Sequence, residues 1–144
     1  MLFGEADADI LKAAAWLHDV GYAPDICDTG FHPLDGAVWL RGCGFEDRVC
    51  ALVAYHTCAD IEAEERGFAD RLKAFSRETS LVADALLYAD MTSGPDGQDF
   101  AVGARLDEIV ARYGEGHGVA RFIRRARPVI LEAAERVETQ LALC

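Results

Sequence analysis

The sequence contains no hydrophobic run that approaches the roughly 20 residues needed to cross a bilayer. Its first residues include acids, whereas a secretory signal peptide would have a basic region there. These two absences predict a soluble, cytoplasmic protein that does not act at a membrane.

The sequence also lacks a Cys-x-x-Cys pair, and its cysteines are odd in number: Cys27, Cys43, Cys50, Cys58 and Cys144. This pattern predicts reduced, mostly buried thiols and excludes a disulfide framework or a zinc knuckle. Cys43 and Cys50 lie seven residues apart in segments expected to be helical. We therefore expect them to share one face and to belong to the core.

Positive charge is scarce: 14 Lys and Arg oppose 25 Asp and Glu, for a net charge of −11. Affinity for a nucleic-acid polymer comes from clustered basic side chains, so such a partner is not expected. A nucleotide or phosphate ester is not excluded, because a bound metal supplies local positive charge. One basic cluster exists, Arg121, Arg124, Arg125 and Arg127, of which the first three share a helix face. It could bind phosphate, but a solvated face paired with acids is favoured.

No segment alternates polar and apolar residues with the period of two that marks a strand, whereas helical spacing is widespread, as at Ile10, Ala14 and Leu17. Half of the residues are apolar, enough for the core of one domain. The prediction is a single all-α domain over residues 1–144. Beyond the first helix, helices are expected at 32–42, 47–56, 68–75, 80–90, 100–113 and 119–143. Residues 60–66 are expected to form a loop or frayed helix, residues 93–97 a tight turn, and Pro128 a kink or restart.

The dipeptide His18-Asp19 closes the apolar run AAAWLHDVG. An imidazole nitrogen and a carboxylate oxygen together suit a divalent metal such as manganese, iron, cobalt, nickel or zinc. Neighbours on a helix differ by about 100° in direction, so both can reach one ion only near a helix end. Gly21 is expected to supply that end in the left-handed conformation. Alone, the pair is weak evidence for a metal, because it also arises by chance and a semi-buried histidine that forms a salt bridge with its neighbour explains it.

Three later residues stand at similar helix boundaries: His32 in FHPLDGA, His56 in YHTCAD, and Asp90 in ADALLYADMTSG. Each has a structural explanation by itself, as a cap, a helix-terminal cation or a turn residue. Together, the order His-Asp, His, His, Asp resembles the HD superfamily of metal-dependent phosphohydrolases. The closest resemblance is to the bacterial branch that includes diadenosine tetraphosphate hydrolases, and it extends from about Ala13 to Gly97.

The resemblance implies an HD-type helical bundle with one or two divalent ions, of Mn, Fe, Co, Ni, Zn or Mg. His18, Asp19 and Asp90 would hold the first metal. His32 and His56 would hold a second, with Asp19 bridging the two ions. Asp19, His32 and His56 are the expected catalytic residues. In a one-metal version, the two histidines would bind substrate phosphate or transfer a proton.

The family pattern begins with a histidine upstream of the HD pair, and no histidine precedes His18 here. We therefore expect the chain to lack the family's first helix. That helix would help to cover Ala13, Trp16 and Leu17, and an exposed apolar patch tends to mark an interface. A homodimer is the predicted assembly.

The expected function is hydrolysis of a nucleotide or another small phosphate ester by water that the metal activates. The alternative is a degenerate, non-catalytic HD-like domain that binds a nucleotide or a partner protein. A third hypothesis is an oxygenase reaction at a di-iron centre, as in some HD relatives.

Several residues around the expected centre are predicted to serve the substrate or the ligands. Residues 91–97 should border the pocket, and Asp35, one turn after His32, could orient that histidine. The candidates for phosphate contact are Arg66, Arg105 and Arg112. His117 is expected to be a loop residue.

Overall fold

The computed structural model describes all 144 residues, and these form helices without any strand. The all-α prediction is therefore confirmed. The elements are α1 (Glu5–Leu17), η1 (Val20–Tyr22), α2 (His32–Gly42), α3 (Asp47–Tyr55), η2 (His56–Cys58), α4 (Ala59–Arg66), α5 (Ala69–Leu72), α6 (Leu81–Thr92), α7 (Val102–Tyr113) and α8 (Gly118–Ala142). One isolated bridge joins Ser93 to Asp99 in the turn after α6. None of the helices has both the length and the apolar character needed to span a bilayer.

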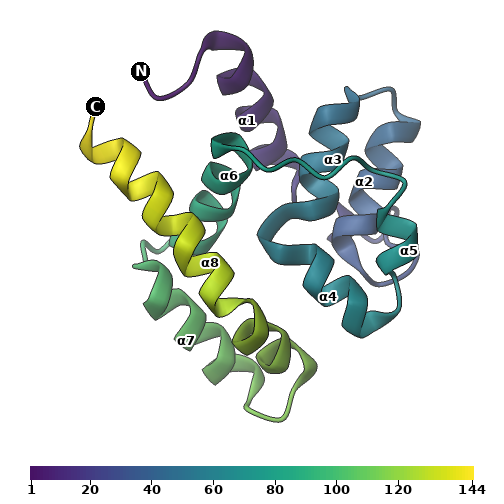
Figure 1. Cartoon of the computed structure of the whole chain (residues 1–144). Coiled ribbons are helices and arrows are strands. Elements are labelled where there is room, and N and C mark those ends of the chain that lie inside the picture. Colours follow the sequence, from purple (N-terminus) through teal and green to yellow (C-terminus); the bar gives the residue numbers. More distant parts are fainter.

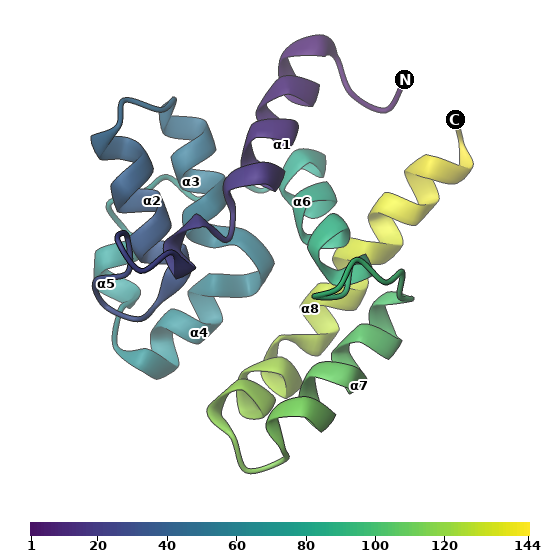
Figure 2. The same ribbon diagram turned by 180° about the vertical axis from the view of Figure 1, so that it is seen from behind.

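The helices gather into two groups that α1 joins. Helices α2 to α5 lie on one side, α6 to α8 lie on the other, and α1 packs against both α3 and α6 (Figures 1 and 2). The first group encloses a core around Phe31, Leu40 and Val53, and the second encloses one around Leu106 and Ile130. A third core, which includes Ala14, lies where α1 meets α3 and α6. The ends of α1 and α6 are thereby brought to the boundary between the two groups.

Several helix boundaries follow from local chemistry. The Ser80 hydroxyl accepts a hydrogen bond from the Ala83 backbone N–H, so Ser80 is the N-cap of α6. Residues 59–66 form the regular helix α4, whereas α5 is shorter than predicted. Helix α8 continues through Pro128, so the predicted restart there is wrong. The residues on either side of Pro128 that include Ala126 and Ile130 are buried in the core that α8 forms with α6 and α7, which holds the helix in place although proline removes a backbone hydrogen bond.

Gly21 is required for a different reason from the one predicted. It lies inside η1 and does not adopt a positive φ. A Cβ at this position would lie 2.1 Å from the carbonyl oxygen of His32 and 2.8 Å from the backbone nitrogen of Gly36. Glycine is therefore needed because η1 lies directly on the first turns of α2.

The cysteines are less buried than expected. All five are free, but Cys27, Cys43 and Cys144 are exposed, and only Cys50 and Cys58 are buried. The shared face predicted for Cys43 and Cys50 is wrong, because the turn between α2 and α3 separates them. Cys43 caps the end of α2, so the seven-residue spacing does not run along one helix.

The arginines at the start of α8 form the solvated face that the sequence favoured. Arg124 pairs with Glu115, and Arg127 pairs with Asp107. Arg125 contacts Glu64 and Glu65 of α4. His117 precedes α8, as expected for a loop residue, and its Nδ1 accepts the Val119 N–H as an N-cap. This face makes its ion pairs within the protein.

Candidate metal centre

Five residues from different segments converge where the two helix groups meet. His18 caps the end of α1, and Asp19 follows it at the start of η1. His32 is the first residue of α2, and His56 stands between α3 and η2. Asp90 lies in the last turn of α6. All five residues proposed as ligands from the sequence are thus brought together.

Asp19 stands between three imidazoles. Its Oδ2 lies 3.4 Å from Nε2 of His18, and its Oδ1 lies 3.3 Å from Nε2 of His32. The same Oδ1 is 3.9 Å from Nε2 of His56. The two carboxylate oxygens therefore point toward different histidines, as a bridging ligand requires.

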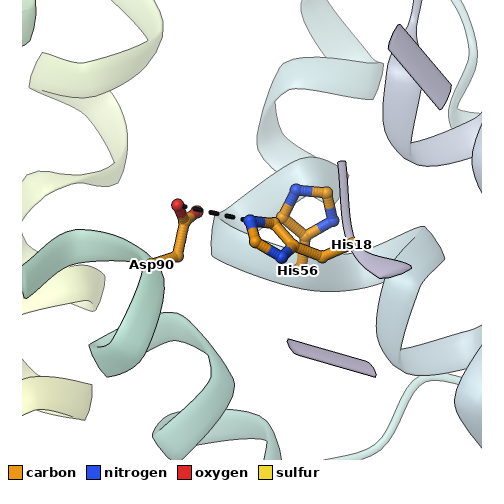
Figure 3. A group of neighbouring side chains, drawn as sticks. All are labelled: His18, His56 and Asp90. Carbon is orange, nitrogen blue, oxygen red and sulfur yellow. Dashed lines mark ion pairs between the residues drawn. The ribbon is translucent and has the colours of Figure 1, made fainter. Parts of the chain in front are cut away.

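The second carboxylate, Asp90, faces His18 and His56 (Figure 3). Asp90 Oδ1 lies 3.5 Å from Nε2 of His18. Two groups of ligand atoms can be distinguished, His18 with His56 and Asp90, and Asp19 with His32 and His56. Within each group all atoms lie within 4.8 Å of one another. His56 belongs to both groups, a position that the sequence did not indicate.

Backbone carbonyls fix the orientation of two of the rings. The Nδ1 of His18 is 2.8 Å from the Ala15 carbonyl oxygen, and the Nδ1 of His56 is 2.6 Å from that of Val53. A carbonyl can only accept, so each Nδ1 carries the donated proton. In the neutral ring, Nε2 then holds the lone pair that faces the centre. This is the usual arrangement of a metal-binding histidine.

Thr57 supports the centre, a role that the sequence analysis did not assign. Its Oγ1 donates a hydrogen bond of 2.6 Å to Oδ2 of Asp90. Thr57 and Cys58 both have positive φ, at 50° and 58°, which non-glycine residues rarely adopt. This backbone turn lets consecutive residues, His56 and Thr57, both face the centre. The only sequence signal was the position of Thr57 in the Tyr-His-Thr motif.

The charges at the centre are strongly coupled. Burial lowers the pKa of His18, but a hydrogen bond to Asp90 and the charges of Asp90 and Asp19 raise it to about 9. Burial likewise raises the pKa of Asp90, but His18 and His56 bring it down to about 2. Burial lowers the pKa of His56 to about 4. His56 is therefore neutral at pH 7. Burial raises the pKa of Asp19, but its hydrogen bond to His32 outweighs burial and lowers the pKa below the ordinary value. Both carboxylates are therefore ionised at pH 7.

Asp35 does not orient His32, so that expectation is wrong. The buried carboxylate of Asp35 accepts hydrogen bonds from the backbone N–H groups of Asp28, Thr29 and Gly30. It also accepts one from the Thr29 hydroxyl, at 2.7 Å. Asp35 therefore holds the loop of residues 28–30 against α2. The neighbour that packs on His32 is instead Tyr22, whose ring stacks on the imidazole at a centroid distance of 3.9 Å.

Two adjoining cavities open beside the five residues, with volumes of about 330 and 600 Å³. We call them together the cleft. Both cavities are lined by Asp19, Tyr22, Asp90, Arg105, Arg112 and Tyr113. Arg66 lines the smaller cavity, so all three arginines proposed for phosphate contact reach the cleft.

The loop after α6 borders the cleft in part. Met91 lines one cavity, and Ser93, Gly94 and Pro95 line the other. Thr92 is not among the lining residues, because its hydroxyl donates a hydrogen bond to the Tyr88 carbonyl within α6. The loop expected to border the pocket therefore does so chiefly through small and apolar groups.

The five residues fit a divalent metal. Metal bonds of about 2.1 Å place neighbouring ligand atoms roughly 3 to 4 Å apart, and the contacts above lie between 3.3 and 3.9 Å. Nitrogen and carboxylate donors suit the borderline divalent ions named above. His32 Nε2 and His56 Nε2 lie only 3.2 Å apart, with His56 Nε2 unprotonated. Two inward-facing nitrogens at this distance suit a shared cation.

The family comparison agrees with this geometry. The family model for the HD domain matches residues 1–93, which include all five residues of the centre. No curated protein and no solved structure matches the chain significantly. Because the family match covers well over half of the sequence, the chain belongs to the HD domain family.

Proposed function

We propose that the protein is a metal-dependent phosphohydrolase that acts on a nucleotide or another small phosphate ester. The observation that carries this proposal is the convergence of His18, Asp19, His32, His56 and Asp90 beside an open cleft. When bound, a divalent cation supplies charge that acidifies water and stabilises phosphoryl oxygens. Membership in the HD domain family supports the same chemistry.

The residues of the centre have different roles in the proposed reaction. His18, His56 and Asp90 are held by backbone carbonyls and Thr57, so they provide a rigid ligand set. Asp19 lines both cavities and remains ionised, so it can accept a proton from the attacking water. His32 also faces the cleft, where Tyr22 fixes its ring, and it can hold or transfer a proton to the leaving oxygen.

A covalent route through cysteine is not supported. Cys58 is the only cysteine near the centre, but it is buried and lines neither cavity of the cleft. Burial raises the pKa of its thiol to about 12, so almost no thiolate is present at neutral pH. We therefore propose direct attack of water on phosphorus.

The cleft offers recognition for a nucleotide. Tyr22 and Tyr113 line both cavities and are exposed, so each can stack on a base. Arg66, Arg105 and Arg112 can contact phosphate oxygens. The resemblance of the motifs to those of the branch that includes diadenosine tetraphosphate hydrolases supports a nucleotide substrate as well.

Elemental analysis followed by hydrolysis assays tests the proposal. The variants His18→Ala and Asp90→Ala should lose bound manganese or iron and should reduce hydrolysis of a nucleotide panel at least about 100-fold. His117→Ala is the matched control, since this histidine lies outside the centre and should leave metal content unchanged. Unchanged metal content in both site variants would show that the centre is misassigned. Bound metal with no turnover on any substrate would instead favour the binding-only domain.

A further inference from the structure

Arg105 of α7 is a buried charge with incomplete pairing. It is only 8% exposed, yet it lines both cavities of the cleft. One of its Nη atoms contacts Glu108, while its buried Nε has no hydrogen-bond partner. A buried polar group without a partner is destabilising, so each such group in a native protein calls for an explanation. Arg105 lies outside residues 1–93, so the family match does not explain it.

Arg105 shares its only carboxylate partner with a second arginine. Nε of Arg112 lies 3.4 Å from Oε1 of Glu108, and Arg112 also lines both cavities. Two guanidinium groups therefore face one carboxylate, which leaves one positive charge in excess. Neither arginine forms an ion pair with Asp19 or Asp90, whose partners are the histidines.

This excess charge is unusual for the protein as a whole. The chain carries 11 more acidic than basic residues, yet the α7 wall of the cleft is basic. Asp19 and Asp90 would be neutralised by metal, so they do not cancel the charge of Arg105 and Arg112. An anion that enters the cleft can pair with the positive charge that Glu108 leaves uncompensated.

We propose that Arg105 and Arg112 form a second anion subsite, separate from the metal centre. The preferred substrate then carries two anionic groups, with one phosphoryl group at the metal centre and a second phosphate on the α7 arginines. The protein should thus select compounds with two linked phosphates over simple monoesters. This inference rests on the proposed function for the first phosphoryl group, whereas the arginine subsite can be measured by binding alone.

Calorimetric titration of the manganese-loaded protein tests the subsite without turnover. The probes are methylenediphosphonate, which has two linked phosphonates and resists hydrolysis, and methylphosphonate, which has one. We expect the wild-type protein to bind methylenediphosphonate at least about tenfold more tightly, since its second phosphonate can form charge-assisted hydrogen bonds with the two arginines. Arg112→Gln, a change at a half-exposed side chain, should reduce this preference about tenfold. Arg105→Lys keeps the charge but loses the planar fork, and should also reduce it.

Arg127→Gln is the matched control. It removes one charge and one ion pair to α7, with Asp107, but Arg127 lines neither cavity. Its preference for methylenediphosphonate should equal that of the wild type. The proposal is overturned if wild-type protein binds both probes equally, or if Arg112→Gln and Arg105→Lys retain the full preference. Methylenediphosphonate can also chelate the manganese through both phosphonates, so the preference supports the subsite only where the arginine variants reduce it. A preference that depends on the two arginines, in a protein that hydrolyses nothing, would support the subsite while contradicting the proposed function.

Discussion

Replacing Gly21 by alanine tests how tightly the HD pair is fixed against α2. The added Cβ would lie 2.1 Å from the His32 carbonyl oxygen, 2.8 Å from the Gly36 nitrogen and 2.9 Å from the His32 carbonyl carbon. Ordinary contacts require about 3.5 Å or more, so η1 must move away by more than about 1 Å. All three atoms belong to the backbone and cannot rotate away as a flexible side chain would.

The expected cost is at the upper end of the range for overpacking, about 3 kcal/mol in the free energy of unfolding. For a chain of 144 residues this corresponds to a melting temperature roughly 10 °C lower. The displacement also moves Asp19, two residues before Gly21, away from His32. If the protein is active, a misplacement of about 1 Å should lower turnover about 100-fold.

Urea unfolding followed by circular dichroism measures the effect, with Gly42→Ala as the matched control. Gly42 is the last residue of α2, and a Cβ there meets no atom within 4 Å. Alanine is a better helix former than glycine, so this control should be neutral or more stable by up to about 1 kcal/mol. Equal stability of the Gly21→Ala variant and the wild type would refute the packing argument.

Three further predictions address the loop, the chemistry and the assembly. Asp35→Asn should destabilise the protein by about 2–4 kcal/mol in thermal unfolding, because the new amide cannot accept all the hydrogen bonds made by the carboxylate. Those bonds lower the pKa of Asp35 despite burial, so its contribution is present above its ordinary pKa of 3.8 and is lost as the pH falls through the lower folded value. If the wild-type protein loses no more stability on acidification than Asp35→Asn does, this prediction is contradicted. Asp19→Asn should reduce turnover far more than Cys58→Ser. Loss of activity in Cys58→Ser with metal still bound would contradict direct attack by water. Trp16 is 88% exposed, and we propose that it is covered in a homodimer. Light scattering should give a mass of twice 15.7 kDa for the wild type and a monomer for Trp16→Glu. A wild-type monomer at micromolar concentration would count against the homodimer.

The sequence was sufficient for the all-α architecture, for most of the helices and for the five residues that meet at the candidate centre, because all of these depend on local signals. Helical spacing of apolar residues predicts the elements that bury them, and Ser80 marks the start of α6 through its own hydrogen bond. The five candidate ligands were identified because each stands at a helix boundary and they follow one another in a recognisable order. Their meeting follows once those helix ends are packed at one place.

The tertiary structure alone decided how close these residues lie and which neighbours hold them. The contacts of Asp35 with residues 28–30, the close approach of η1 to α2 at Gly21, and the shared position of His56 all depend on distances between segments. No periodicity within one segment encodes such distances. The pairing of Arg105 and Arg112 through Glu108 is different, because spacings of three and four residues on one helix are visible in the sequence. Only the packing of α7 against α6 and α8 places Arg105 and Arg112 in the cleft beside the candidate metal centre. The physical reason is that burial of a side chain depends on the elements that surround its helix and not on the helix itself.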